Sequence, residues 1–113
     1  MSANPSTVNL LVSWDPGLNR PTVNDPQQTV SASPGDMVVI IWTPADPSIA
    51  ITSITGFPSA VSVAGPDSDG NWMATYQAPA NAGRWSYIVS ASLNGSAVVR
   101  HDPEIDNTPP PQT

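Results

Sequence analysis

The spacing of proline and glycine limits what this chain can fold into more than any other feature. Fourteen Pro and seven Gly are spread over 113 residues, and the longest stretches free of both are residues 6–15 and 84–94. Pro inside a helix costs about 3 kcal/mol and Gly about 1 kcal/mol, so the sequence predicts no long helix. Eleven Val, seven Ile and nine Thr favour strands instead.

Alternation of apolar residues places the strands. The even positions from Val8 to Trp14 are all apolar, as on a strand with one buried face. Residues 37–43 are apolar on both faces, which predicts a strand in the centre of a sheet. Asn94-Gly95 is a strong hairpin-turn signal. The expected strands cover residues 8–14, 27–33, 37–43, 49–54, 60–64, 71–77, 84–92 and 96–100.

Seven or eight short strands separated by turns predict an all-β fold, an antiparallel Greek-key β-sandwich. One domain is expected over residues 1–102. Two segments are expected to lie outside the strands. Residues 15–26 hold three Pro and are interpreted as a long crossover between two sheets. Residues 103–113 are polar and rich in Pro, and are predicted to form an extended or disordered tail.

Charge and cysteine content exclude several classes of function. Three Arg and no Lys stand against nine acidic residues, for a net charge of −6, which argues against binding nucleic acid or an anionic membrane. Because the chain has no Cys, disulfides, thiolate zinc sites and iron–sulfur clusters are excluded. The sequence lacks a transmembrane stretch and a signal-peptide pattern, so a cytoplasmic location is expected, with release as part of an assembly as the alternative.

Three stretches of the sequence resemble known β-sandwich proteins. Residues 33–42, a Pro-Gly-Asp turn followed by an apolar strand that ends in Trp, resemble the corresponding strand of cupredoxins. Residues 81–87 are similar both to a cupredoxin strand and to strand F of immunoglobulin-like domains. Residues 100–107 are similar to the end of small bacterial sandwich proteins. The resemblance implies a Greek-key sandwich scaffold, and says nothing about a ligand.

Copper binding does not carry over from the cupredoxin resemblance. Type I copper needs a Cys thiolate and two His. The chain has Val89 where the resemblance would place the Cys, and His101 is its single histidine. We therefore expect no copper and no other cofactor.

No pattern of catalytic residues stands out. A Ser-His-acid triad would have to use His101, but no Ser lies in a Gly-x-Ser-x-Gly turn. All nine acidic residues lie in predicted turns or in the tail, which favours a solvated surface over paired catalytic carboxylates. We expect that the protein is not an enzyme.

Two acidic clusters are weak candidates for metal binding. Asp67 and Asp69 lie in a segment similar to a calcium loop, but their spacing departs from the EF-hand pattern and a hairpin turn explains them. Asp102, Glu104 and Asp106 would share one face of an extended tail and could bind a divalent cation. A solvated turn and a solvated tail are the preferred interpretations.

The remaining candidates point to interaction rather than chemistry. Phe57 is expected in an exposed loop, while Trp14 and Trp72 at strand ends either plug the sandwich or form a carbohydrate platform or protein interface. Residues 27–33 and 96–100 are predicted edge strands with almost no charge, and Val30 lies in the first.

We therefore predict a structural or protein-interaction module that meets its own copies or another protein. The settings considered are a coat or filament subunit, a phage decoration protein and a subunit of a bacterial complex. The alternative is a module that binds a small ligand or glycan through loop aromatics.

Overall fold

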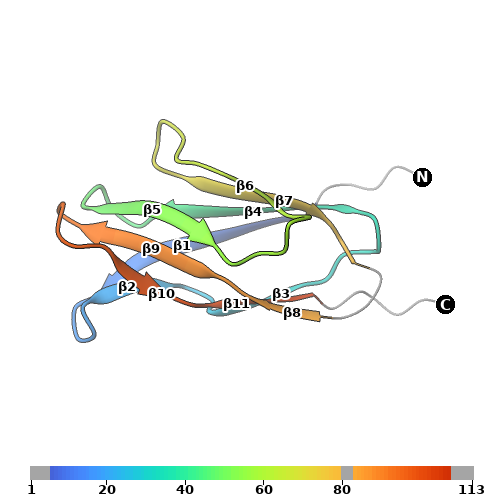
Figure 1. The fold of residues 1–113 in the computed structure, drawn as a ribbon, viewed down its shortest axis with the longest axis horizontal. Helices are drawn as coiled ribbons and strands as arrows, with labels where there is room; N and C mark the ends of the chain where they lie inside the picture. Colours follow the sequence, from blue (N-terminus) through green and yellow to red (C-terminus); the bar gives the residue numbers. More distant parts are fainter. Residues whose placement is uncertain (1–5, 80–82, 108–113) are drawn as a thin grey trace.

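The computed structural model describes residues 6–79 and 83–107, and this part of the chain is all-β, with no helix (Figure 1). No helix there is long and apolar enough to cross a membrane. The strands are β1 (Ser6–Asp15), β2 (Arg20–Val23), β3 (Gln27–Val30), β4 (Met37–Pro44), β5 (Ile49–Thr55), β6 (Ser62–Ala64), β7 (Trp72–Gln77), β8 (Gly83–Ser86), β9 (Ile88–Leu93), β10 (Val99–His101) and β11 (Glu104–Asn107).

The largest sheet has five strands in the order β2-β1-β4-β7-β6. The apolar run over residues 37–43 forms its central strand, β4, as predicted. Val38, Ile40 and Trp42 are fully buried on the inner side, while the odd-numbered positions face outward. The alternation predicted for residues 8–14 is also confirmed, because Leu10 and Val12 on β1 are buried.

The prediction of purely antiparallel sheets is wrong for two strand pairs. β1 runs parallel to β4, and β11 runs parallel to β3. Parallel neighbours require a crossover connection, and the chain makes each by leaving one sheet and returning later. Local alternation carries no information about such pairings, because it reports only which face of a strand is buried.

Two three-stranded sheets, β10-β9-β5 and β3-β11-β8, form the rest of the fold. Their registers match, since His101 lies opposite Val89 and Glu104 lies opposite Ser86. From His101 to Glu104 is three residues, and from Val89 back to Ser86 is also three, so the same register continues from one sheet into the other. The backbone N–H of Tyr87 also donates to the Pro103 carbonyl across the junction at 3.0 Å. The segments 83–93 and 99–107 therefore form one long antiparallel ladder with a short interruption.

The turn of this ladder is the predicted Asn94-Gly95 hairpin. Asn94 and Gly95 have φ values of +52° and +74°, and the N–H of Ser96 donates to the Leu93 carbonyl at 3.0 Å. Two consecutive positive φ values define the type I′ turn that matches the twist of the flanking strands. The second strand begins at Val99 rather than at the predicted residue 96.

Both segments predicted to lie outside the strands contain strands. Within residues 15–26, β2 pairs with β1, because Pro21 and Val23 alternate with polar residues and are buried. Within the predicted tail, β11 lies between β3 and β8 and buries Ile105 and Asn107. Strand pairing and burial thus continue past residue 102. Residues 108–113, and residues 81–82 of one family-like motif, lie outside the described residues.

The core forms where inward side chains of the five-stranded sheet contact those of the other two sheets. The indole Nε1 of Trp42 donates to the Tyr87 hydroxyl at 3.1 Å, and the Tyr76 hydroxyl donates to Asn107 Oδ1 at 2.8 Å. Burial raises the pKa of each tyrosine to about 12. The eleven strands exceed the seven or eight predicted, partly because the long ladder is divided at Tyr87 and Pro103.

Candidate interaction site

The structure uses the carboxylate of Asp67 to hold a turn. Its Oδ1 accepts backbone N–H groups of Asp69 at 2.8 Å and of Asn71 at 2.9 Å, as an Asp does in an Asx turn. Nowhere in residues 6–79 and 83–107 do three His, Cys, Asp or Glu side chains gather as metal ligands would. These contacts support the turn interpretation of the 67–71 segment.

The second acidic cluster pairs with an arginine. Arg84 lies opposite Asp106 in the β8–β11 register, and its guanidinium is 3.8 Å from both Glu104 and Asp106. All three side chains remain partly exposed, so the ion pairs contribute little to stability. Asp102 is exposed in the short interruption between β10 and β11.

His101 is half-buried at the end of β10. Its Nε2 atom is buried without a hydrogen-bond partner among the described residues. Burial lowers the pKa of His101 below its usual 6.5, the nearby positive charge of Arg20 lowers it further, and Asp102 opposes both. No Ser hydroxyl in the described part of the chain is hydrogen-bonded to this nitrogen. The arrangement resembles a structural histidine.

The lowered pKa of His101 predicts a dependence of stability on pH. The unfolded chain binds the proton more tightly, so folding stability should fall as the pH drops through about 6.5. The melting temperature of the wild type should therefore fall between pH 7.5 and pH 5.5, measured by circular dichroism. In His101→Gln this fall should be smaller. Equal slopes in the two proteins would contradict the assignment.

Phe57 does not project as the exposed loop aromatic that was expected. Its ring stacks on Tyr87 at a centroid distance of 4.8 Å, and lies 5.9 Å from Trp42 and 6.1 Å from Trp85. The side chain is half-buried and packs against the core. A single apolar residue between Gly and Pro indicates an exposed loop in the sequence. In the structure the side chain of this loop residue packs on the aromatic residues of the core.

Trp14 and Trp72 both pack partly against the core, which supports their interpretation as plugs. Trp14 Nε1 donates to Asn19 Oδ1 at 3.2 Å, and Trp72 Nε1 donates to the backbone carbonyl of Ile51 at 3.0 Å. A Cβ on Gly65 would lie 2.4 Å from the Trp72 ring, so only glycine fits against that face. Trp72 also lines a surface pocket of about 340 Å³.

The predicted edge strand 27–33 exists as the shorter β3, at the end of its sheet. The side chain of Val30 is buried in the core, with 3% of its surface exposed, so it offers nothing to a partner. Replacing it with Pro would damage the core as well as the ladder. The neighbouring segment 15–26 is held to β1 through β2, and so it is not a loop that can move aside.

Three other edge strands, β2, β6 and β5, are also protected against pairing. β2 carries Arg20 and Pro21, and β6 has three residues. On β5 the Ile51 carbonyl already accepts the Trp72 indole, and a bulge interrupts the strand between Ile51 and Ser53. Short length, charge, proline and bulges are the features by which natural proteins protect sheet edges. These three edges therefore offer little room for an added strand.

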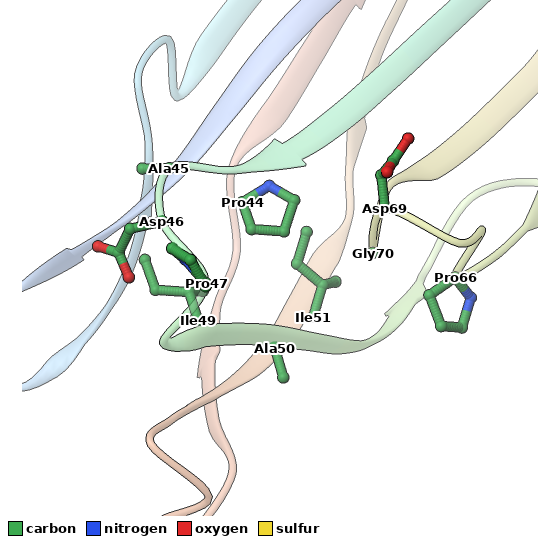
Figure 2. A pocket seen from close by; sticks show the side chains of 10 residues that line it. All are labelled: Pro44, Ala45, Asp46, Pro47, Ile49, Ala50, Ile51, Pro66, Asp69 and Gly70. Atoms are coloured by element: carbon green, nitrogen blue, oxygen red, sulfur yellow. The ribbon is translucent and has the colours of Figure 1, made fainter.

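A groove of about 560 Å³ lies beside the start of β5 (Figure 2). The β4–β5 turn, with Pro44 and Pro47, forms one wall, and the turn around Pro66 and Gly70 forms the other. Asp46 and Asp69 are its only ionisable lining residues. Asp46 Oδ1 already accepts hydrogen bonds from the backbone N–H and the hydroxyl of Ser48. The groove thus lacks a paired nucleophile and base among its described lining residues.

The outer surface of the five-stranded sheet is the most unusual feature of the molecule. We use the name outer face for the five apolar residues Leu11, Met37, Val39, Ile41 and Met73. Leu11, Met37 and Met73 are 43%, 43% and 44% exposed, and the other two are half-buried. The open face of such a sheet is normally polar, because water covers it.

No charged side chain interrupts the outer face where β1, β4, β7 and β6 pair. The row across these strands reads Asn9, Ile41, Met73 and Ala64, and the next row reads Thr7, Val39, Thr75 and Ser62. The apolar residues on both faces of residues 37–43 already indicated this surface in the sequence. The pattern was interpreted only as a sign of a central strand, and the apolar outer side that it also indicates was missed.

No protein family matches the chain, and no curated protein is similar to it in sequence. The argument for function therefore depends on the surfaces described above.

Proposed function

We propose that the three sheets form one Greek-key β-sandwich, immunoglobulin-like or cupredoxin-like. The continuous ladder of residues 83–93 and 99–107 joins the two small sheets into one layer that faces the five-stranded sheet. Hydrogen bonds from Trp42 to Tyr87 and from Tyr76 to Asn107 cross between these layers. The two parallel pairs are the departure from a purely antiparallel sandwich.

On this scaffold we propose a non-enzymatic, structural protein-interaction module that binds another protein chain through the outer face. The observation that carries the proposal is an uncharged apolar sheet surface exposed to water. An exposed apolar patch marks an interaction site on a soluble protein. Most acidic residues lie in turns, and Asp15, Glu104 and Asp106 lie on strands outside the paired rows of this surface, so none of them interrupts it.

Substitutions on the inner and outer sides of the five-stranded sheet test whether the outer face is a binding surface or is needed for folding. Ile40→Thr should lower the free energy of unfolding by about 3 kcal/mol, since Ile40 is fully buried. The outward change Ile41→Thr with Met73→Thr should cost less than about 1 kcal/mol, because Thr is a good strand former and both sites reach water. Urea denaturation measures both.

The outward pair should also reduce the fluorescence of a dye that binds apolar surface. A loss of stability in Ile41→Thr/Met73→Thr as large as that in Ile40→Thr would show that the face is needed for folding. The proposal that it is kept for binding would then fail.

A second candidate function is binding of a glycan at the pocket beside Trp72. The pocket of about 340 Å³ combines this aromatic ring with the carboxylate of Asp67 and the amide of Asn71. An aromatic ring with a few polar groups is the usual composition of a small-ligand site. A sugar that raises the melting temperature and quenches Trp fluorescence would favour this function.

A further inference from the structure

We propose that the outer face packs against the outer face of a second copy of the chain, an inference that rests on the proposed protein-interaction function. The two copies would be related by a two-fold axis near Ile41 and Met73, which are direct cross-strand neighbours in the register. A two-fold contact needs one surface that is complementary to itself. A sheet face whose paired rows carry no charged side chain meets that condition, because packed sheets interdigitate side chains across their faces.

Charge identifies the partner as another copy. The chain carries a net charge of −6, so a basic partner would be drawn to the acidic turns and to the pair of Glu104 and Asp106 rather than to the outer face. The outer face instead fits a partner surface that is itself apolar and uncharged. This chain presents such a surface, because the paired rows of β1, β4, β7 and β6 carry no charged side chain.

The size of the face predicts a weak dimer. Four strands about 4.8 Å apart and five residues long cover roughly 300 Å². A standard stable interface buries about 800 Å² on each partner. We therefore expect a dissociation constant of roughly 10–1,000 µM. Added salt should strengthen the dimer, because it screens the repulsion between two acidic copies while the apolar contact is unaffected.

Sedimentation equilibrium on the whole chain, from about 10 µM to 1 mM, tests this inference. The wild type should show an average mass that rises above 11.8 kDa with concentration and with added salt. Met73→Glu places two buried like charges near the axis and should raise the dissociation constant by more than about tenfold. Val98→Glu is the matched control, since Val98 is 52% exposed and lies away from the sheet in the segment before β10. It should associate as the wild type does.

Two results would overturn the inference. One is an average mass of the wild type that stays at 11.8 kDa up to the highest protein concentration, even in high salt. The other is association that Met73→Glu and Val98→Glu weaken equally. Neither result touches the comparison of Ile40→Thr with Ile41→Thr/Met73→Thr, which tests the outer face as a binding surface for any protein.

Discussion

A chain that ends at Pro103 should fail to fold cooperatively, whereas a chain that ends at Asn107 should fold. The shorter chain lacks β11, which is the sole strand joining β3 to β8 in the described residues. It also lacks Ile105, which is fully buried, and Asn107, which accepts the Tyr76 hydrogen bond. We expect the free energy lost with these contacts to exceed the unfolding free energy of a small domain, which is about 5–15 kcal/mol.

Urea unfolding of both chains, followed by near- and far-ultraviolet circular dichroism, measures the difference. The chain that ends at Asn107 is the control, because it keeps every described contact of β11. If the chain that ends at Pro103 gave a sigmoidal transition with the same midpoint, β11 would be a dispensable tail, and residues 1–102 would be the domain after all.

Trp42→Ala should lower the free energy of unfolding by about 4 kcal/mol. The indole is fully buried, and it packs 5.4 Å from the Tyr87 ring and 5.9 Å from the Phe57 ring. Removing it leaves a large cavity and also leaves the buried Tyr87 hydroxyl without its donor. The change in the urea midpoint, at a constant m-value, gives the loss.

Trp42→Phe separates the two contributions. It keeps an aromatic ring in the core and removes the indole N–H, so its cost should be about 2 kcal/mol and clearly below that of Trp42→Ala. A cost below about 1 kcal/mol for Trp42→Ala would be incompatible with a tightly packed aromatic core around Tyr87.

The strand content could be predicted because it depends on local sequence. The dispersal of Pro and Gly ruled out long helices, alternation identified β1 and β7, and a continuous apolar run identified β4. The pairing could not be predicted in the same way. β1 lies beside β4 although their residues are about thirty positions apart, and β3 lies beside β11 across most of the chain. Such non-local pairings are decided by the whole set of buried faces.

Proline misled the prediction in two places. Pro21 in β2 and Pro103 before β11 were taken as marks of loops, yet both side chains are buried. β2 lies at the end of its sheet. Pro is tolerated in such an edge strand, because an N–H on its open side would have no neighbouring strand to donate to. Pro103 occupies the interruption in the long ladder, where its carbonyl still accepts the Tyr87 N–H.

The candidate site was predictable only in part. The low charge and the absence of Lys pointed to a surface that meets another chain. The expected location was a sheet edge or face, and the edge strand over residues 27–33 was preferred because an edge presents unpaired N–H and C=O groups. The structure shows that Trp72 caps part of the β5 edge and that Val30 is buried, while Met37 and Ile41 on β4 and Met73 on β7 face outward, with Ile41 directly opposite Met73.

Cross-linking through a single introduced cysteine tests the central claim most directly, because the chain has no Cys of its own. Met73→Cys lies near the proposed two-fold axis, so mild oxidation should join two copies into a covalent dimer on a non-reducing gel. Val98→Cys, which is 52% exposed and off the outer face, should stay largely monomeric at the same concentration. Equal cross-linking of the two variants, or none in Met73→Cys, would contradict an outer face that binds its own copy.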